Sequence, residues 1–198
     1  MNKHRKRACV LLLAGFVLIC TALCIHLVQQ KQDQMAGKTA ALLLEQLELS
    51  RLPAVDEEIT ESEKRDPQLP PRQYMGYPLI GSICVPSVDI RLPVLDAWDE
   101  AMLKVAPCRY RGSISNGDLI IMGHNYKSHF TPLRSVQLGA QVEFTNTDGK
   151  VFRYRVAAIE TLHRDEGQRL DSTYPLTIFT CTPGGIYRFV VRCEAVET

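Results

Sequence analysis

The sequence has almost no net charge. Its 198 residues carry 23 lysines and arginines against 22 acidic residues, which gives a formal net charge of +1 at pH 7. A protein that binds nucleic acid over a broad surface needs a clear excess of basic side chains to neutralise the phosphates. The composition therefore excludes such a surface, and we expect no nucleic-acid partner.

The chain also lacks the cysteine spacing of a metal site. It has seven cysteines but no CxxC pair, which zinc ribbons and fingers use to bring two thiolates together. We therefore expect no metal and no cofactor. Cys84, Cys108, Cys181 and Cys193 lie outside the apolar N-terminal run, where they either form two disulfides or stay as thiols; for Cys84, Cys108 and Cys193 we favour buried thiols.

Residues 8–28 contain no charged side chain. At 1.5 Å per residue a helix of this length spans roughly 30 Å, the thickness of a membrane's hydrocarbon core. Four basic residues precede it in residues 1–7, so the positive-inside rule predicts a cytoplasmic tail, a single-pass membrane anchor at 8–28 and an extracellular remainder. A cleaved signal peptide is the alternative, but its apolar region is shorter and ends at a small-residue cleavage site.

Residues 29–75 predict a juxtamembrane helix and a linker. Leucines among good helix formers favour a helix in the first part, "QQKQDQMAGKTAALLLEQLELSRL". The second part, "PAVDEEITESEKRDPQLPPRQ", is acidic, contains prolines and has few large apolar groups, so it cannot form a core.

Residues 76–198 are typical of a mainly β domain. Short runs of β-branched and aromatic residues are separated by turn signals, and Asp148-Gly149 marks a hairpin. The segments "AWDEAMLKV" and "FTPLRSV" predict short helices. At least six strands in one domain indicate a closed or nearly closed β-barrel.

Three side chains in this domain are candidates for nucleophilic chemistry. His124 follows the apolar strand "DLIIM", and Cys181 ends another, "LTIF". A thiol near its ordinary pKa of about 8.5 is mostly protonated at neutral pH, and a neighbouring imidazole or cation activates it. Gly184 and Gly185 allow a turn that returns Arg188 toward the sulfur, where a guanidinium can stabilise an oxyanion.

Two other interpretations of Cys181 were considered. A phosphatase loop needs Cys-x5-Arg with the arginine entering a helix, whereas here the interval is Cys-x6-Arg and the following segment is strand-like. A buried structural thiol is the other interpretation, since a single cysteine in a strand usually belongs to the core.

Four separated motifs resemble the sortase family. "LTIFTC" matches its Thr-Leu-x-Thr-Cys signature, with Ile178 in place of the leucine. "IMGHN" is similar to its catalytic histidine segment, "YRFVV" to its arginine strand and "IGSICVPSVDIRLPVL" to its opening. The likeness covers about residues 76–196. It implies an eight-stranded sortase β-barrel with a few short helices, preceded by the membrane helix.

The resemblance also implies a function. Sortases are transpeptidases on the outer face of the Gram-positive cell membrane. Cys181 would attack a sorting signal like Leu-Pro-x-Thr-Gly and form a thioacyl enzyme, with His124 as the acid and base. Arg188 would hold the substrate carbonyl, and Arg192 is its rival for that role. Thr180 and Asn125 are tentative substrate-binding residues. The amino acceptor would come from a peptidoglycan precursor or a pilin lysine.

The resemblance leaves the subclass open. The histidine segment is class B-like, but "HRDEGQRLDSTYP" is too short for the helical insertion that class B enzymes carry before the cysteine. No carboxylate cluster for calcium is evident. A cysteine peptidase that only hydrolyses, and a binding module without catalysis, are the alternative functions.

Overall fold

The computed structural model describes residues 3–51 and 71–196. The chain divides into two compact units, Met1–Met35 and Ala36–Thr198, which are considered separately below. The acidic part of the predicted linker falls on residues outside the described ranges.

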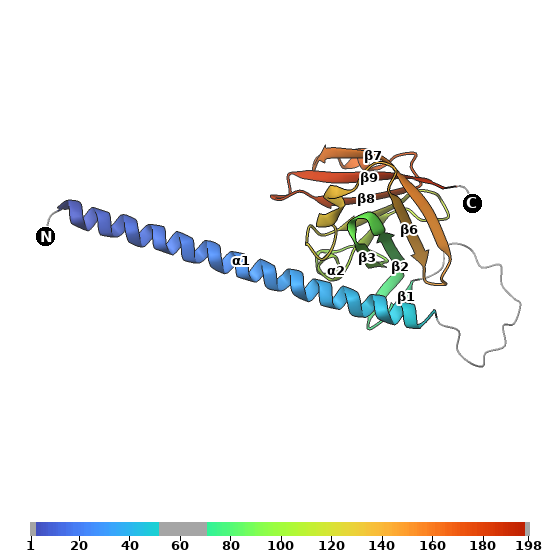
Figure 1. Ribbon diagram of the computed structural model, residues 1–198, viewed down its shortest axis with the longest axis horizontal. Coiled ribbons are helices and arrows are strands. Elements are labelled where there is room, and N and C mark those ends of the chain that lie inside the picture. Colours follow the sequence, from blue (N-terminus) through green and yellow to red (C-terminus); the bar gives the residue numbers. More distant parts are fainter. Residues whose placement is uncertain (1–2, 52–70, 197–198) are drawn as a thin grey trace, which may run out of the picture. The chain divides into compact units, whose positions relative to one another are not determined.

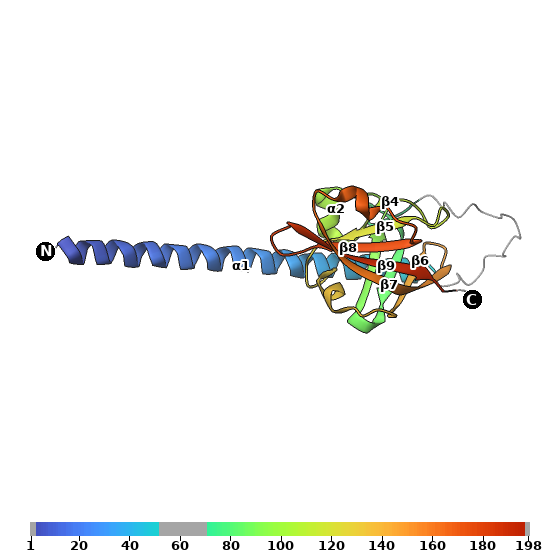
Figure 2. The same cartoon turned by 90° about the horizontal axis from the view of Figure 1, so that it is seen from above.

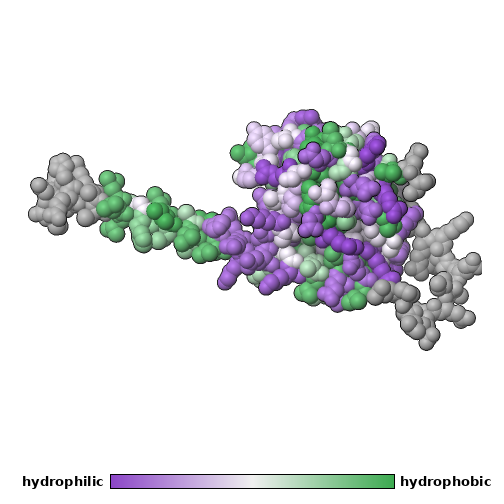
Figure 3. Space-filling model, in the orientation of Figure 1, coloured by the Kyte–Doolittle hydropathy of each residue, from purple (hydrophilic) through white to green (hydrophobic). Residues whose placement is uncertain are grey.

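One long helix, α1 (Lys3–Leu49), begins in the first unit. It is long and apolar enough to cross a membrane by length and composition, with a mean hydropathy of 2.6 in its most apolar window. The large apolar side chains in residues 11–28 are exposed, and Figure 3 shows them as a continuous hydrophobic surface. The helix expected at 8–28 and the juxtamembrane helix are thus one unbroken element, while insertion into a membrane stays a prediction.

The last part of α1 belongs to the second unit. Ala36, Ala40, Leu43 and Leu47 are buried, at a spacing of three and four residues that puts them on one face of the helix. Three of them, Ala40, Leu43 and Leu47, belong to the same apolar cluster as the barrel interior. The segment that we expected to be a juxtamembrane helix therefore forms part of the domain's core.

The second unit is built around one closed sheet of antiparallel and parallel strands (Figure 1). Its strands are β1 (Arg72–Tyr74), β2 (Tyr77–Val85), β3 (Ile90–Leu95), β4 (Cys108–Arg111), β5 (Leu119–Gly123), β6 (Gln141–Asn146), β7 (Val151–His163), β8 (Leu176–Cys181) and β9 (Tyr187–Ala195). The order is β1-β2-β3-β4-β5-β8-β9-β7-β6, and β6 pairs back with β2. Strands β2 to β9 therefore close an eight-stranded barrel, as predicted, and β1 adds a short hairpin that starts four residues before Gly76.

Short helices connect these strands. The predicted helix in "AWDEAMLKV" is α2 (Glu100–Val105), whose first turn is capped by Asp99 accepting from the Met102 amide at 2.7 Å. The one in "FTPLRSV" is the 3-10 helix η2 (Thr131–Ser135). Two further 3-10 turns are η1 (Pro86–Val88) and η3 (Gly167–Leu170), and η3 lies in the loop between β7 and β8.

Alternate residues of β5, β8 and β9 point to opposite faces of the barrel wall. One set, including Ile121, Ile178 and Val191, joins the large interior core. The other set forms a second apolar cluster on the outer face, called here the outer cluster. It consists of Ile120, Met122, Leu162, Leu170, Phe179 and Val190. Figure 2 shows β8, β9 and β7 side by side in the part of the wall that carries it.

Candidate active site

The pairing of β5 with β8 brings His124 and Cys181 to the same edge of the barrel. The two strands are parallel, and Gly123 is the register partner of Thr180. His124 directly follows Gly123, and Cys181 directly follows Thr180, so the two occupy neighbouring positions where both strands end. The His124 ring stacks on Tyr126, with a centroid distance of 3.9 Å and an interplanar angle of 14°.

Arg188 lies directly across from Cys181 on the next strand. The antiparallel register of β8 and β9 pairs Cys181 with Arg188. Gly184 and Gly185 both have positive φ, of 84° and 71°, which residues with a side chain rarely adopt, so the predicted glycine turn is present. The Gly185 amide closes this turn by donating to the Thr182 carbonyl at 2.9 Å.

The Arg188 guanidinium lies over the Phe179 ring, 5.6 Å from its centroid, a distance at which a cation–π attraction operates. Its Nη1 atom is buried and makes no hydrogen bond within the described part of the chain. A buried donor without a partner is costly, and a substrate oxygen would satisfy it.

Arg192 has different surroundings from Arg188. It pairs with Thr177, four residues before the end of β8, and its side chain is 2 % exposed. Its guanidinium donates to the Leu170 carbonyl at 2.6 Å and to Thr177 Oγ1 at 3.1 Å. Both Nη atoms of Arg192 therefore have protein partners, while its Nε has none in the described ranges, and the side chain lies away from the thiol.

Thr180 and Asn125, the two tentative substrate-binding residues, flank the pair of strand ends. Thr180 is completely buried, and its hydroxyl has no hydrogen-bond partner among residues 3–51 and 71–196. The main-chain oxygen of Asn125 accepts from Thr131 Oγ1 at 2.6 Å, which ties the histidine loop to η2. Their contact with substrate stays a prediction.

Two of the other thiols of the barrel differ from Cys181 in burial. Cys108 and Cys193 are fully buried, and burial raises the pKa of each to about 12. Cys84 is half-buried, and burial is the main cause that raises its pKa. All of these and Cys181 are free thiols, so the two-disulfide alternative is absent from this part of the structure.

The outer cluster was not identified from the sequence. It extends from Phe179, two residues before the thiol, to Leu170 of the β7–β8 loop, and Leu103 and Tyr110 pack against it. The sequence does contain a signal for it. In "DLIIM" and "LTIF" consecutive residues are apolar, and because neighbouring side chains of a strand face opposite ways, half of them must lie outside the barrel. Its members are at most 8% exposed, so the cluster lies beneath the surface of this part of the barrel wall.

A separate hollow lies elsewhere in the barrel. A cavity of about 750 Å³ is lined by Trp98, Arg109, Phe152 and Leu119, among others. Leu119 begins β5, whereas His124 follows its end, so this hollow lies at the opposite end of the strand from the candidate site. In the described ranges no group of three or more histidine, cysteine or acidic side chains is arranged to hold a metal ion.

The fold and this edge of the barrel define a class of protein, a closed eight-stranded β-barrel with a cysteine, a histidine and an arginine on neighbouring strand ends. The family model for the sortase domain matches residues 83–196. This match covers more than half of the chain, and the protein belongs to the sortase family.

Two curated relatives and several solved structures are similar to this chain. Sortase A of Listeria monocytogenes is 27% identical over 110 residues, covering 52% of this chain and 49% of the relative. Sortase A of Streptococcus agalactiae is 26% identical over 141 residues, covering 62% and 55%. The chain thus spans about half the length of the curated relatives it matches.

Among solved structures, a lid mutant of sortase A from Corynebacterium diphtheriae matches with a TM-score of 0.58 and 25% identity, covering 80% of this chain and 94% of that one. Listeria monocytogenes sortase A matches with a TM-score of 0.53 and 27% identity, covering 60% and 88%. Streptococcus agalactiae sortase C1, at 20% identity and a TM-score of 0.54, covers 61% and 70% and supports the fold alone.

Proposed function

We propose that this protein is a membrane-anchored cysteine transpeptidase. It cleaves a sorting signal like Leu-Pro-x-Thr-Gly between threonine and glycine and transfers the fragment that ends in threonine, through its carbonyl, to an amine. The observation that carries the proposal is the strand register. It pairs Cys181 with Arg188 on β9, and the pairing of Gly123 with Thr180 brings the position of His124 next to that of Cys181. Membership of the sortase family supports the same reaction class.

In the first half-reaction the Cys181 sulfur attacks the threonine carbonyl carbon of the Thr–Gly bond. A carbon–sulfur bond forms, and the carbonyl electrons move to the oxygen. Arg188 stabilises this oxyanion, for which its unpaired Nη1 is a suitable donor. The carbon–nitrogen bond then breaks, and His124 gives its proton to the leaving glycine amine. A thioester remains on Cys181.

The second half-reaction reverses these roles. An incoming amine attacks the thioester carbonyl, His124 takes the proton from the amine, and the carbon–sulfur bond breaks. The product is a new amide, and the Cys181 thiolate is restored. The acceptor is an amine of a peptidoglycan precursor or a pilin lysine, and no metal or cofactor takes part.

The outer cluster is the proposed buried support of the peptide groove floor, since its members are at most 8% exposed. Phe179 is on the same face of β8 as Cys181, because the two are separated by one residue. Val190 on β9 and Met122 on β5 extend this floor to both sides. The leucine and proline of a sorting signal are the apolar groups that would lie on it.

The proposed location follows from the N-terminal unit. Residues 8–28 anchor the protein in the cell membrane by a single pass, the basic residues 1–7 stay in the cytoplasm, and the barrel at 76–198 lies outside. Residues 29–75 connect anchor and barrel. The support is the length and apolar composition of α1 together with the charge asymmetry.

The first test removes the nucleophile. Cys181→Ala is expected to lower cleavage of a sorting-signal peptide by at least about 1,000-fold, because the covalent route is lost. Cys84→Ala is the matched control, since it removes another partly accessible thiol and is expected to keep activity within about two-fold. Turnover like that of the wild type in Cys181→Ala would overturn the proposal.

The second test separates transfer from hydrolysis and from binding alone. Triglycine is added as the amine, and mass spectrometry follows the products. A transpeptidase gives the ligated peptide, whereas a peptidase gives only the free acid. A non-catalytic module gives neither, and in that case Cys181 is expected to react with an alkylating reagent no faster than Cys84.

A further inference from the structure

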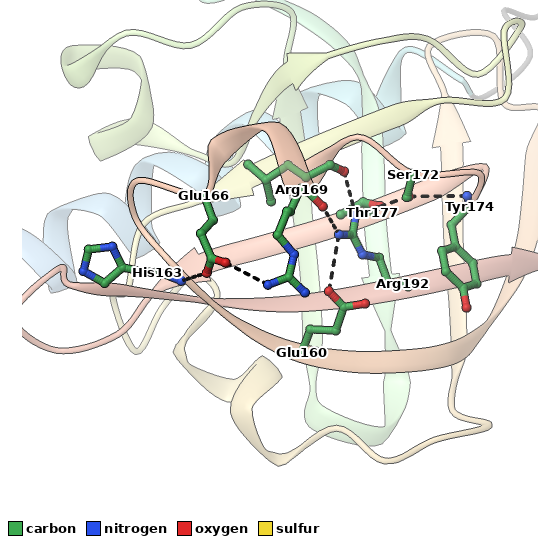
Figure 4. Close-up of polar contacts among 9 residues, drawn as sticks. Glu160, His163, Glu166, Arg169, Ser172, Tyr174, Thr177 and Arg192 are labelled. Atoms are coloured by element: carbon green, nitrogen blue, oxygen red, sulfur yellow. Dashed lines mark hydrogen bonds and ion pairs between the residues drawn. The ribbon is translucent and has the colours of Figure 1, made fainter.

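The buried guanidinium of Arg192 binds the loop between β7 and β8, residues 164–175 (Figure 4). Its Nη1 donates to the Leu170 carbonyl at 2.6 Å and to Ser172 Oγ at 3.2 Å, and its Nη2 donates to the Arg169 carbonyl. Two of these three acceptors are main-chain carbonyls. The contacts therefore fix the path of the loop backbone whatever side chains it carries.

The charge of Arg192 has only one carboxylate beside it in the described ranges. Glu160 Oε2 lies 3.5 Å from Nη2, and the glutamate side chain is 35% exposed. Burial of a charge is unfavourable unless pairing and hydrogen bonds compensate it. Most of the compensation here comes from the loop carbonyls, so the arginine and the loop conformation depend on each other.

The loop held in this way contacts both parts of the proposed site. Leu170, whose carbonyl accepts from Arg192, is fully buried in the outer cluster with Phe179 and Val190. At Gly167 a Cβ atom would lie 3.3 Å from Arg188 Nη1, so this turn of the loop lies directly against the Arg188 guanidinium. One segment thus borders the groove floor and packs on the oxyanion donor.

We propose that Arg192 is a positioning residue, which holds the β7–β8 loop as a fixed wall of the peptide groove and, through Gly167, sets the place of the Arg188 guanidinium. This inference rests on the proposed function for its effect on substrate, but the clamp itself is a property of the free protein. Arg192 is not a catalytic residue, because it contacts loop and strand and lies away from the thiol.

The test replaces Arg192 in the full-length chain, purified in detergent. Arg192→Met introduces an unbranched apolar side chain and removes every hydrogen-bond donor of the guanidinium. Hydrogen–deuterium exchange of this variant is followed by mass spectrometry. Exchange of the amides in residues 164–175 is expected to accelerate at least ten-fold, while the interior strands stay protected. Arg192→Lys, which retains charge and one donor nitrogen, is expected to restore part of the protection.

Arg111→Met is the matched control. Its Nη1 bonds Asp171 of the same loop at 2.8 Å, but that ion pair is exposed on both sides. Exposed pairs contribute little, so exchange of the loop is expected to stay within about two-fold of the wild type. Loop exchange in Arg192→Met equal to that of the control would overturn the clamp.

Kinetics test the effect on the site. Arg192→Met is expected to raise KM for the sorting-signal peptide at least ten-fold, because the groove wall is no longer fixed. Gly167→Val, which pushes a side chain toward Arg188, is expected to lower kcat more than it changes KM. If Arg192→Met fails to fold, Arg192→Lys takes its place, because it keeps the charge but lacks the second Nη atom, and a loop that exchanges like the wild type in that variant would contradict the proposal.

The two proposals fail in distinguishable ways. A wild-type chain without peptide cleavage contradicts the transpeptidase, while faster loop exchange in Arg192→Met still supports the clamp. Normal cleavage and unchanged KM in Arg192→Met contradict the positioning role and leave the transpeptidase intact.

Discussion

The thiols of the barrel differ at the scale of single residues. Cys108 and Cys193 are enclosed in the interior core, whereas Cys181 is half-buried at the end of β8. A thiolate is poorly solvated in an apolar interior, which is why burial raises the pKa of both enclosed thiols to about 12. These two cysteines are therefore poor nucleophiles and act as small apolar residues.

The raised pKa values predict a loss of stability at high pH. In the unfolded chain both thiols ionise near pH 9, but in the fold they stay protonated to about 12. Because the pKa is higher in the folded state, the contribution of the two thiols to folding stability is complete below pH 9. It is lost as the pH rises from 9 toward 12. At pH 10 the free energy of unfolding should fall by about 1.4 kcal/mol per thiol.

Urea denaturation at pH 7.5 and pH 10 measures this loss. The double variant Cys108→Ala/Cys193→Ala is expected to be less stable at pH 7.5, because cavities form, but to lose less on going to pH 10. An equal loss in the double variant would contradict the assignment of these thiols.

At the scale of elements, the sequence predicted the parts whose signals are local. The strand "LTIFTC", the turn at Gly184 and Gly185, and α2 all follow from short-range patterns and are present. The glycine turn and the family motif also predicted that Arg188 returns beside Cys181, and the register of β8 with β9 pairs the two residues. The hydrogen bonds of Arg192 to the β7–β8 loop were not predictable, because they join residues that are far apart in the sequence.

The last turns of α1 were also misjudged from the sequence. A leucine-rich helix between an anchor and a linker was interpreted as a separate connecting element, yet Leu43 and Leu47 complete the barrel's core. Arg51 reinforces this packing by donating to the Asn146 carbonyl at 2.6 Å. Residues 36–51 therefore belong to the second unit, and a fragment that starts at residue 71 lacks part of its core.

Leu43→Ala tests this assignment. Removal of a fully buried leucine is expected to lower the free energy of unfolding by about 2–5 kcal/mol. Leu42→Ala is the matched control, since Leu42 is the preceding residue and is 50% exposed. This substitution should change the free energy of unfolding by less than about 1 kcal/mol. Urea denaturation of a chain that begins at residue 29 measures both. Equal, small effects would place the helix outside the core.

At the scale of the whole molecule, the chain combines an apolar helical unit and a folded unit that favour different solvent environments. The exposed apolar side chains of residues 11–28 are unfavourable in water and favourable in lipid. The barrel has a mixed polar surface and an interior core of its own, which suits an aqueous compartment. For a helix that spans a membrane, the positive-inside rule predicts from the basic residues at the N-terminus that this compartment is outside the cytoplasm.

The predicted orientation is tested with alkaline phosphatase, an enzyme that becomes active only outside the cytoplasm, fused after residue 198. The full chain should give an active, membrane-pelleted fusion of full mass, because Lys3, Arg5, Lys6 and Arg7 hold the N-terminus inside. Deletion of residues 1–28 is the control and should give an inactive fusion. A shorter, released and active product would show a cleaved signal peptide. An inactive, membrane-bound fusion of the full chain would place the barrel on the cytoplasmic side, away from any surface-protein substrate.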